Sequence, residues 1–409
     1  MQTGRRDFLT VSASYWAFTL TDGALRMLVL LHFYQTGFNA FQLALLFTLY
    51  ELAGIFTNLA GGWLAGRFGL RAMLGSGIAL QIGALVMLAG LDSSWPGWLA
   101  LVWVLLSQGL SGIAKDMTKV AAKSAIRLSA GQAGSRLFTW TAFFTGSKNS
   151  VKGAGFFLGG LLLGWIGFEA TLLGLAGFLL VLLGLVWMRL PGDLGLVQGK
   201  RKGGGLLARS RQMNLLSAAR VFLFGARDIW FVVGLPVTLY GAGWSFWQTG
   251  GFLALWTVFY GMVQASAPRF VARSPDGLSA ELPAAGRLAG LNFLVIAGLW
   301  AALIASPAAG GSAGPIAVLI GGLLVFGAVF ALNSSVHSYL LLALTGGEKT
   351  SEDVGFYYAA NAAGRLAGTL LSGWCMLQGG IAACLLGAGV FLLLAFILTR
   401  AIQPPPQPV

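Results

Sequence analysis

Twelve apolar segments, separated by turn-forming or charged breaks, limit the fold of this sequence more than any other feature. Each is long enough to cross a hydrocarbon core of about 30 Å, which takes about 20 helical residues. The predicted spans are residues 9–33, 41–65, 72–91, 97–121, 138–163, 169–189, 216–240, 246–266, 288–306, 315–343, 354–377 and 381–400. Only 10% of the 409 residues are charged, against about a quarter in an ordinary soluble domain. The sequence therefore predicts an all-α polytopic membrane protein, embedded in lipid.

The distribution of Lys and Arg between the loops predicts the orientation. Six alternate loops, near residues 34–40, 92–97, 164–168, 241–245, 307–314 and 378–380, contain no Lys or Arg. The other loops are basic, and basic loops stay in the cytoplasm. We expect a multi-pass protein of the cell membrane (the inner membrane of a bacterium) with both termini in the cytoplasm. Much of the net charge of +13 is then an orientation signal, and it does not indicate a nucleic-acid partner.

A basic, glycine-rich segment at 190–215 divides the predicted spans into two sets of six. It predicts an N-terminal six-helix half at 1–189, a flexible cytoplasmic linker at 190–215 and a C-terminal six-helix half at 216–409. This is the layout of the major facilitator superfamily. Residues 62–71 (GWLAGRFGLR) resemble that superfamily's GxLaDRxGRR-type motif, although Gly66 and Leu70 depart from it. The glycines of span five indicate either close helix packing or an antiporter-like pattern.

Charged residues inside the spans are the strongest functional signal, because a charge at the bilayer centre costs roughly 2.5–3.5 kcal/mol. Six deeply placed cations face at most four carboxylates, which are Asp22, Glu51, Asp116 and Asp228. Local pairs are an alternative for Asp22 with Arg26 and for Asp116 with Lys119, and Glu51 could neutralise one lysine. The count still predicts two or more cations without a protein partner, and hence an anionic substrate.

The candidate site follows from that charge count and from nearby polar side chains. The predicted substrate-binding residues are Arg26, Lys115, Lys148, Asn149, Lys152, Arg227, Tyr357, Asn361 and Arg365. The predicted coupling or ion-pair residues are Asp22, Glu51 and Asp228. We find no metal-ligand cluster, Ser/His/Asp set or Walker-type loop in the sequence, so we expect no catalytic residue, metal or cofactor and no enzyme activity. The remaining alternatives are a drug/proton antiporter, whose cationic substrates these cations would repel, a membrane enzyme acting on lipid phosphates, and a receptor or scaffold that transports nothing.

Three charged strings resemble the ArsJ-type organoarsenical efflux permeases: residues 15–27, 111–119 and 145–153. The resemblance implies export of 1-arseno-3-phosphoglycerate, which forms when glyceraldehyde-3-phosphate dehydrogenase uses arsenate in place of phosphate. That dehydrogenase is then the functional partner that produces the substrate, and lipid is the other partner. The alternative is an exporter or exchanger of another organic or sugar phosphate. Energy coupling stays open between uniport and proton antiport through Glu51, Asp22 or Asp228.

Overall fold

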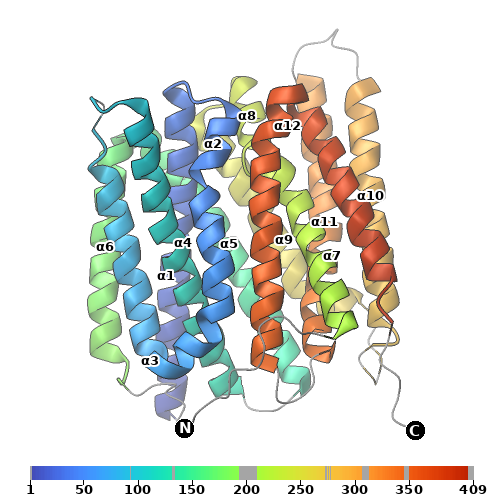
Figure 1. Cartoon of the computed structure of the whole chain (residues 1–409), viewed down its shortest axis with the longest axis horizontal. Coiled ribbons are helices and arrows are strands. Elements are labelled where there is room, and N and C mark those ends of the chain that lie inside the picture. Colours follow the sequence, from blue (N-terminus) through green and yellow to red (C-terminus); the bar gives the residue numbers. More distant parts are fainter. Residues whose placement is uncertain are drawn as a thin grey trace.

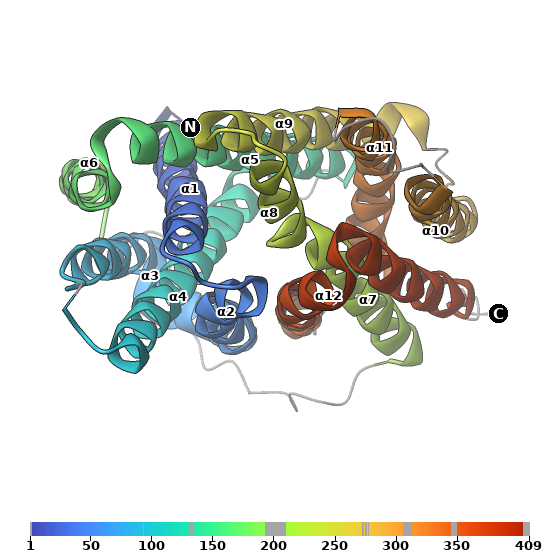
Figure 2. The same cartoon turned by 90° about the horizontal axis from the view of Figure 1, so that it is seen from above.

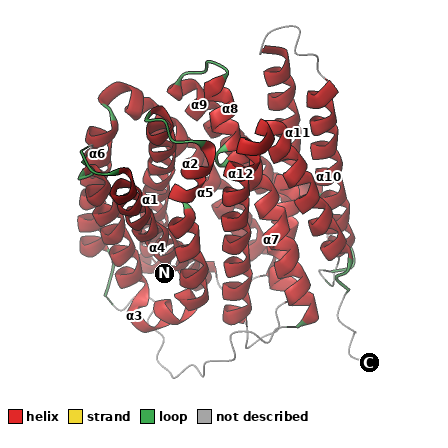
Figure 3. Ribbon diagram, turned by 45° about the horizontal axis from the view of Figure 1, so that its top comes forward, coloured by secondary structure: helices red, strands yellow, loops and turns green. Residues whose placement is uncertain are grey.

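The apolar segments form long helices in the computed structural model, which describes residues 2–92, 94–130, 134–192, 210–271, 274, 276, 278–305, 313–344 and 350–403. The described residues form helices and loops and contain no strand (Figure 3). The helices are α1 (Gln2–Gln35), α2 (Ala40–Leu46), α3 (Thr48–Ala89), α4 (Gly97–Ala130), α5 (Gly134–Ile166), α6 (Phe168–Arg189), α7 (Arg211–Phe231), α8 (Gly234–Gly241), α9 (Phe246–Phe270), α10 (Glu281–Ala305), α11 (Ala313–Leu344) and α12 (Thr350–Arg400). The all-α prediction is confirmed.

Glycine breaks divide two of these helices into separate spans. Gly69 has φ of 76° inside α3, and Gly380 has φ of 62° inside α12, next to the non-helical Gly379. A positive φ is accessible to glycine at little cost, so the chain reverses at both places. Span two comprises α2 and the first part of α3, and span seven comprises α7 and α8. With these divisions the helices account for the twelve predicted spans.

Hydropathy measured over the described helices supports a membrane location. Eight helical stretches in this part of the chain are long and apolar enough to cross a membrane, and one of them is the divided stretch Asp353–Arg400. The charged helix α1, which carries Asp22 and Arg26, is not among them. Its charges therefore need partners inside the protein, and these are described below.

The helices form two groups, α1–α6 and α7–α12, which lie side by side (Figure 2). Between the groups, α5 packs along α9, and α2 and α3 pack against α12. Helix α1 begins and α12 ends at the same end of the molecule (Figure 1). At the opposite end of α1, the ring of Tyr34 contacts that of Tyr240 with centroids 5.4 Å apart. Most of the predicted linker, residues 193–209, lies outside the described residues.

Glycines on α5 allow neighbouring backbones to come unusually close. A Cβ added at Gly155 or Gly159 would lie 2.3 Å from the Leu20 carbonyl oxygen or 2.4 Å from that of Ala24, both on α1. On another face, a Cβ at Gly153 would lie 2.8 Å from the carbonyl oxygen of Ala254 on α9. The packing interpretation of these glycines is therefore confirmed: small residues bring α1 and α9 against α5.

Two alanine substitutions on α5 test this packing. Gly155→Ala is expected to destabilise the protein by about 1–3 kcal/mol, because its Cβ collides with the α1 backbone. Gly164→Ala is the matched control, since no atom lies within 4 Å of its added Cβ. The measurement is the thermal unfolding midpoint of the purified protein in detergent. Equal midpoints for the two variants would contradict the close α1–α5 contact.

Candidate functional site

A cavity of ≈ 350 Å³ lies between the two helix groups. Its lining comes from α1, α3, α4 and α5 on one side and from α7, α8, α9, α11 and α12 on the other. Ligand pockets commonly measure about 300–1,000 Å³, so the space is sufficient for a small organic molecule. The cavity therefore lies where the helix group α1–α6 meets the group α7–α12.

The charged groups that line this cavity are predominantly positive. The eight cationic side chains are Arg26, Lys115, Lys119, Lys148, Lys152, Arg220, Arg227 and Arg365. The four carboxylates are Asp22, Glu51, Asp116 and Asp228. With every group ionised, the described lining carries a formal charge of +4. Such a surplus attracts anions, and the low dielectric of the surroundings strengthens the attraction.

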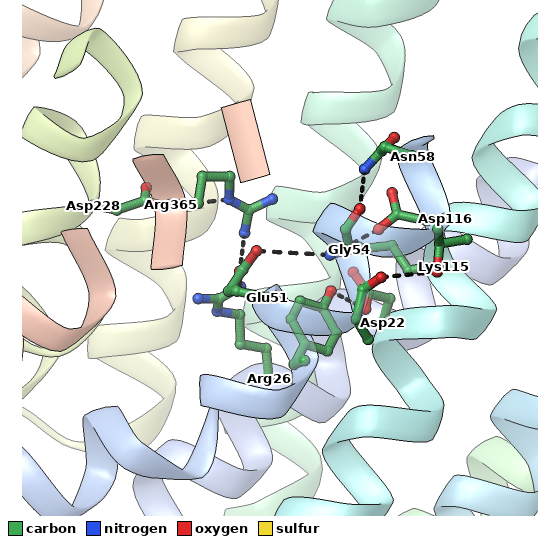
Figure 4. Close-up of polar contacts among 12 residues, drawn as sticks. Asp22, Arg26, Glu51, Gly54, Asn58, Lys115, Asp116, Asp228 and Arg365 are labelled. Atoms are coloured by element: carbon green, nitrogen blue, oxygen red, sulfur yellow. Dashed lines mark hydrogen bonds and ion pairs between the residues drawn. The ribbon is translucent and has the colours of Figure 1, made fainter. Parts of the chain in front are cut away.

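Glu51 on α3 is the centre of the largest ion-pair network in the described residues (Figure 4). Its Oε1 accepts hydrogen bonds from Arg26 Nη1 at 3.0 Å and from Arg365 Nη2 at 2.6 Å. Its Oε2 lies 3.8 Å from Lys115 Nζ. The Glu51 side chain is 0% exposed, so one buried carboxylate is shared by three cations.

Arg365 connects the two halves of the protein through this network. It lies on α12, and its Nε donates to Asp228 Oδ2 on α7 at 3.2 Å while its Nη2 contacts Glu51 on α3. Arg227 then donates from Nε to Asp228 Oδ1 at 2.7 Å. The guanidinium of Arg365 is therefore held between one carboxylate from each half (Figure 4).

Asp22 forms a second cross-helix pair. Lys152 Nζ on α5 lies 2.9 Å from Asp22 Oδ2, and Tyr50 donates to Asp22 Oδ1 at 2.5 Å. The alternative of an internal Asp22–Arg26 pair is wrong, because Arg26 turns to Glu51 on α3 while Asp22 faces α5. The predicted local pair is confirmed on α4, where Lys119 donates to Asp116.

These contacts correct one part of the sequence argument. Arg26, Lys115, Lys152, Arg227 and Arg365 each lie within 4.0 Å of a carboxylate, so the expectation that several of them lack any protein partner is wrong. The carboxylates are shared, because neighbouring helices bring more cations than acids to the same place. The net charge of the lining is still positive, because eight cations share four carboxylates.

The cavity brings together most of the predicted site residues, with one exception. Lys148, Asn149 and Asn361 join the cations described above along its lining. Tyr357 is fully buried and packs with Leu216 and Leu340 in a hydrophobic cluster outside the lining. Tyr358 lines the cavity instead, because successive helical residues point about 100° apart. In the GWLAGRFGLR motif, the side chains of residues 62–67 lie outside the described ones.

Arg220 is a buried cation of the cavity lining that the sequence interpretation missed. It is 5% exposed and lines the cavity from α7. Its Nε donates to Asn361 Oδ1 at 3.0 Å, and its Nη1 lies 3.4 Å from both the carbonyl and hydroxyl oxygens of Ser334. The spacing between Arg220 and Arg227 could have identified it. The two arginines are seven residues apart, which places both on the same face of a helix.

Comparisons with known proteins bear on the fold. No protein-family model and no curated protein matches the sequence. Among solved structures, the human organic anion transporter MFSD10 (TETRAN) matches with a TM-score of 0.67 and 17% identity, over 97% of this chain and 99% of its own. A bacterial homologue of the iron transporter ferroportin, in an outward-facing state, matches with a TM-score of 0.69 and 14% identity, over 98% of each chain. The chain thus shares the overall fold of these two transporters.

Proposed function

We propose that this protein is an alternating-access transporter that exports a small, multiply charged organic anion. The observation that carries the proposal is the cavity between the two halves, whose described lining holds eight cations and four carboxylates. Arginine forks and lysine point charges are the groups that bind carboxylate, phosphate and arsenate oxygens. The human neighbour described as an organic anion transporter is consistent with this substrate class.

The same charges disfavour a cationic substrate. The other neighbour is described as a homologue of an iron transporter, so the fold by itself leaves the sign of the substrate open. A metal ion or a cationic drug entering this cavity would be repelled by the surplus cations. Among the described residues, no group of three or more His, Cys, Asp or Glu side chains could hold a metal ion.

Within the anion class, we propose 1-arseno-3-phosphoglycerate as the substrate and arsenate resistance as the role. The support is the resemblance of residues 15–27, 111–119 and 145–153 to ArsJ-type permeases. These strings contribute Asp22, Arg26, Lys115, Lys148 and Lys152 to the cavity. A molecule with a phosphate and an arsenate group matches the positive surplus. Another organic or sugar phosphate is the second candidate, since its charge would suit the same lining.

The Glu51–Arg365–Asp228 bridge suggests how anion binding is linked to movement of the halves. A substrate oxyanion entering the cavity competes with Glu51 for Arg26, Lys115 and Arg365. Release of Arg365 from Glu51 removes an ion pair that joins α3 to α12. The halves then rock about the bound anion, and the bridge forms again after release. The basic loops support a cytoplasmic location for the linker and for both termini. Export then begins with substrate entering the cavity from the side of the membrane on which the linker lies.

The membrane potential supplies a driving force for export. Moving an anion out of a negative-inside cell is favoured by about 2.3 kcal/mol per charge per 100 mV. Uniport is therefore sufficient for a polyanion. Proton antiport through Glu51, Asp22 or Asp228 is the alternative, and export that persists after collapse of the pH gradient alone would eliminate it.

Inside-out membrane vesicles test the proposed substrate. Vesicles containing the protein receive the dehydrogenase, glyceraldehyde 3-phosphate, NAD and radiolabelled arsenate, so that the arsenylated anion forms outside them. We expect label to accumulate only when all four components are present. Vesicles without the protein are the control. Uptake of labelled phosphoglycerate or sugar phosphate with no uptake of arsenic would support the second candidate and refute arsenical export.

A further inference from the structure

The environment of Arg220 differs from that of the other arginines in the cavity. Arg26, Arg227 and Arg365 each contact a carboxylate within 3.0 Å. The hydrogen-bond partners of Arg220 in the described part of the chain are the neutral side chain of Asn361 and the neutral Ser334. Its guanidinium also lies over the Phe224 ring at 3.7 Å from the centroid. A buried guanidinium whose hydrogen-bond partners are neutral is not neutralised by a carboxylate. Its positive charge is therefore available to attract an anionic ligand.

The hydrogen bonds around Arg220 leave unused donors on side chains that line the cavity. Asn361 uses its Oδ1 to accept from Arg220, which leaves its amide N–H groups to donate. The Ser334 oxygen lies within 3.4 Å of Arg220 Nη1 and 3.5 Å of Gln264 Nε2, which leaves its own hydroxyl hydrogen to donate. The Gln264 side-chain amide is held in this orientation, because its Oε1 accepts a hydrogen bond from Asn149 Nδ2 at 2.7 Å and its Nε2 then faces Ser334. All of these side chains line the cavity.

A site in which charged and neutral donors predominate favours anions. The Nη2 of Arg220 donates no hydrogen bond to the described residues, so it adds a charged donor to those of Asn361 and Ser334. These three side chains come from three different helices, α7, α12 and α11. A phosphoryl group presents three terminal oxygens, one toward each helix, and a charge of about −1.5 to −2, whereas a carboxylate presents two oxygens and a single charge, so the phosphoryl group fits this set of donors better.

We propose that Arg220, Asn361 and Ser334 form a subsite for the phosphoryl group of the transported anion. The subsite lies about two helical turns along α7 from Arg227, toward the start of that helix. The second anionic group of the substrate then faces the network of Glu51, Arg365 and Asp228. The inference rests on the proposed function, because it assigns one end of the same substrate to one end of the same cavity.

The test measures binding of two three-carbon probes to the purified full-length protein. Radiolabelled glycerol 3-phosphate carries the phosphoryl group, and radiolabelled glycerate carries a carboxylate alone. Arg220→Gln is expected to weaken binding of glycerol 3-phosphate by about tenfold or more and to change glycerate binding by less than about twofold. Arg269→Gln is the matched control, since Arg269 is exposed in the last turn of α9, and it is expected to bind both probes as the wild type does.

Asn361→Asp keeps the arginine and is a second, independent variant. The new carboxylate would neutralise the Arg220 guanidinium, so glycerol 3-phosphate binding is expected to fall as much as in Arg220→Gln. Elution from a sizing column and the thermal unfolding midpoint check that each variant is folded. The proposal is overturned if both folded variants bind glycerol 3-phosphate like the wild type, if either loses both probes equally, or if the wild type does not bind glycerol 3-phosphate.

The outcome also separates this inference from the proposed function. Arsenical uptake into vesicles with unchanged probe binding by the Arg220 variant would retain the export proposal and refute the subsite. Binding of glycerol 3-phosphate that requires Arg220, together with no arsenical uptake, would retain the subsite and refute the arsenical substrate.

Discussion

Arg365→Ala is expected to lower transport by about 100-fold or more, which is one of the two largest effects that the structure predicts. The substitution removes the only described guanidinium that contacts a carboxylate from each half, Glu51 on α3 and Asp228 on α7. It also leaves buried acids with fewer partners, and breaking a buried pair costs about 3–5 kcal/mol. The measurement is the initial rate of labelled anion uptake into inside-out vesicles, normalised to the protein present.

Membrane insertion of the Arg365 variant is expected to remain, because insertion depends on the apolar segments. Arg287→Ala is the control, since Arg287 is exposed on α10, and it is expected to transport at the wild-type rate. Arg365→Lys should recover part of the rate, because an ammonium keeps the charge but cannot span both carboxylates as a guanidinium does. Wild-type transport by Arg365→Ala would contradict a functional role for the bridge and favour a scaffold.

Glu51→Gln is expected to tighten anion binding and slow turnover together. The substitution removes the carboxylate that Arg26, Lys115 and Arg365 share, so a substrate oxyanion no longer competes with it. We expect the dissociation constant of glycerol 3-phosphate to fall by about tenfold, and the maximal transport rate to fall by at least as much. Equilibrium binding and the concentration dependence of vesicle uptake measure the two quantities.

Glu169→Gln is the matched control for that experiment, because Glu169 is exposed at the start of α6. It is expected to change neither quantity. Weaker anion binding by Glu51→Gln would contradict the competition between Glu51 and the substrate. Uptake that loses only its dependence on an imposed pH gradient would instead identify Glu51 as the proton carrier of an antiporter.

The sequence predicted the helices well because the features that indicate a helix lie within the helix itself or directly beside it. Apolar length predicted each span, and the glycines at 69 and 379–380 were visible as breaks between spans. The close packing of α5 also followed from local composition, since several small residues recur on its faces. These features depend on residues near one another in the chain, so the position of each element could be inferred without its neighbours.

The partners of the charged residues could not be predicted in the same way. Asp22 and Lys152 are 130 residues apart, and Glu51 and Arg365 are 314 apart. Helical spacing left a local pair of Asp22 with Arg26 open as an alternative, but Arg26 pairs with Glu51 on α3 and Asp22 with Lys152 on α5. The sequence did not indicate whether Tyr357 or Tyr358 lines the cavity, because this depends on which face of α12 is turned toward it. The surplus of cations was predictable because it requires only the count of charges in the spans.

The most direct test of the central claim, that surplus positive charge makes this cavity an anion site, is ligand-induced stabilisation of the purified wild-type protein. The ligands are glycerol, glycerate, glycerol 3-phosphate and 3-phosphoglycerate, which share three carbons and increase in negative charge, with choline as the cation. A ligand that binds the folded state raises the unfolding midpoint according to its affinity. The account predicts that the midpoint rises in that order, with no rise for glycerol or choline. A rise with choline, or equal rises for glycerol and 3-phosphoglycerate, would contradict it.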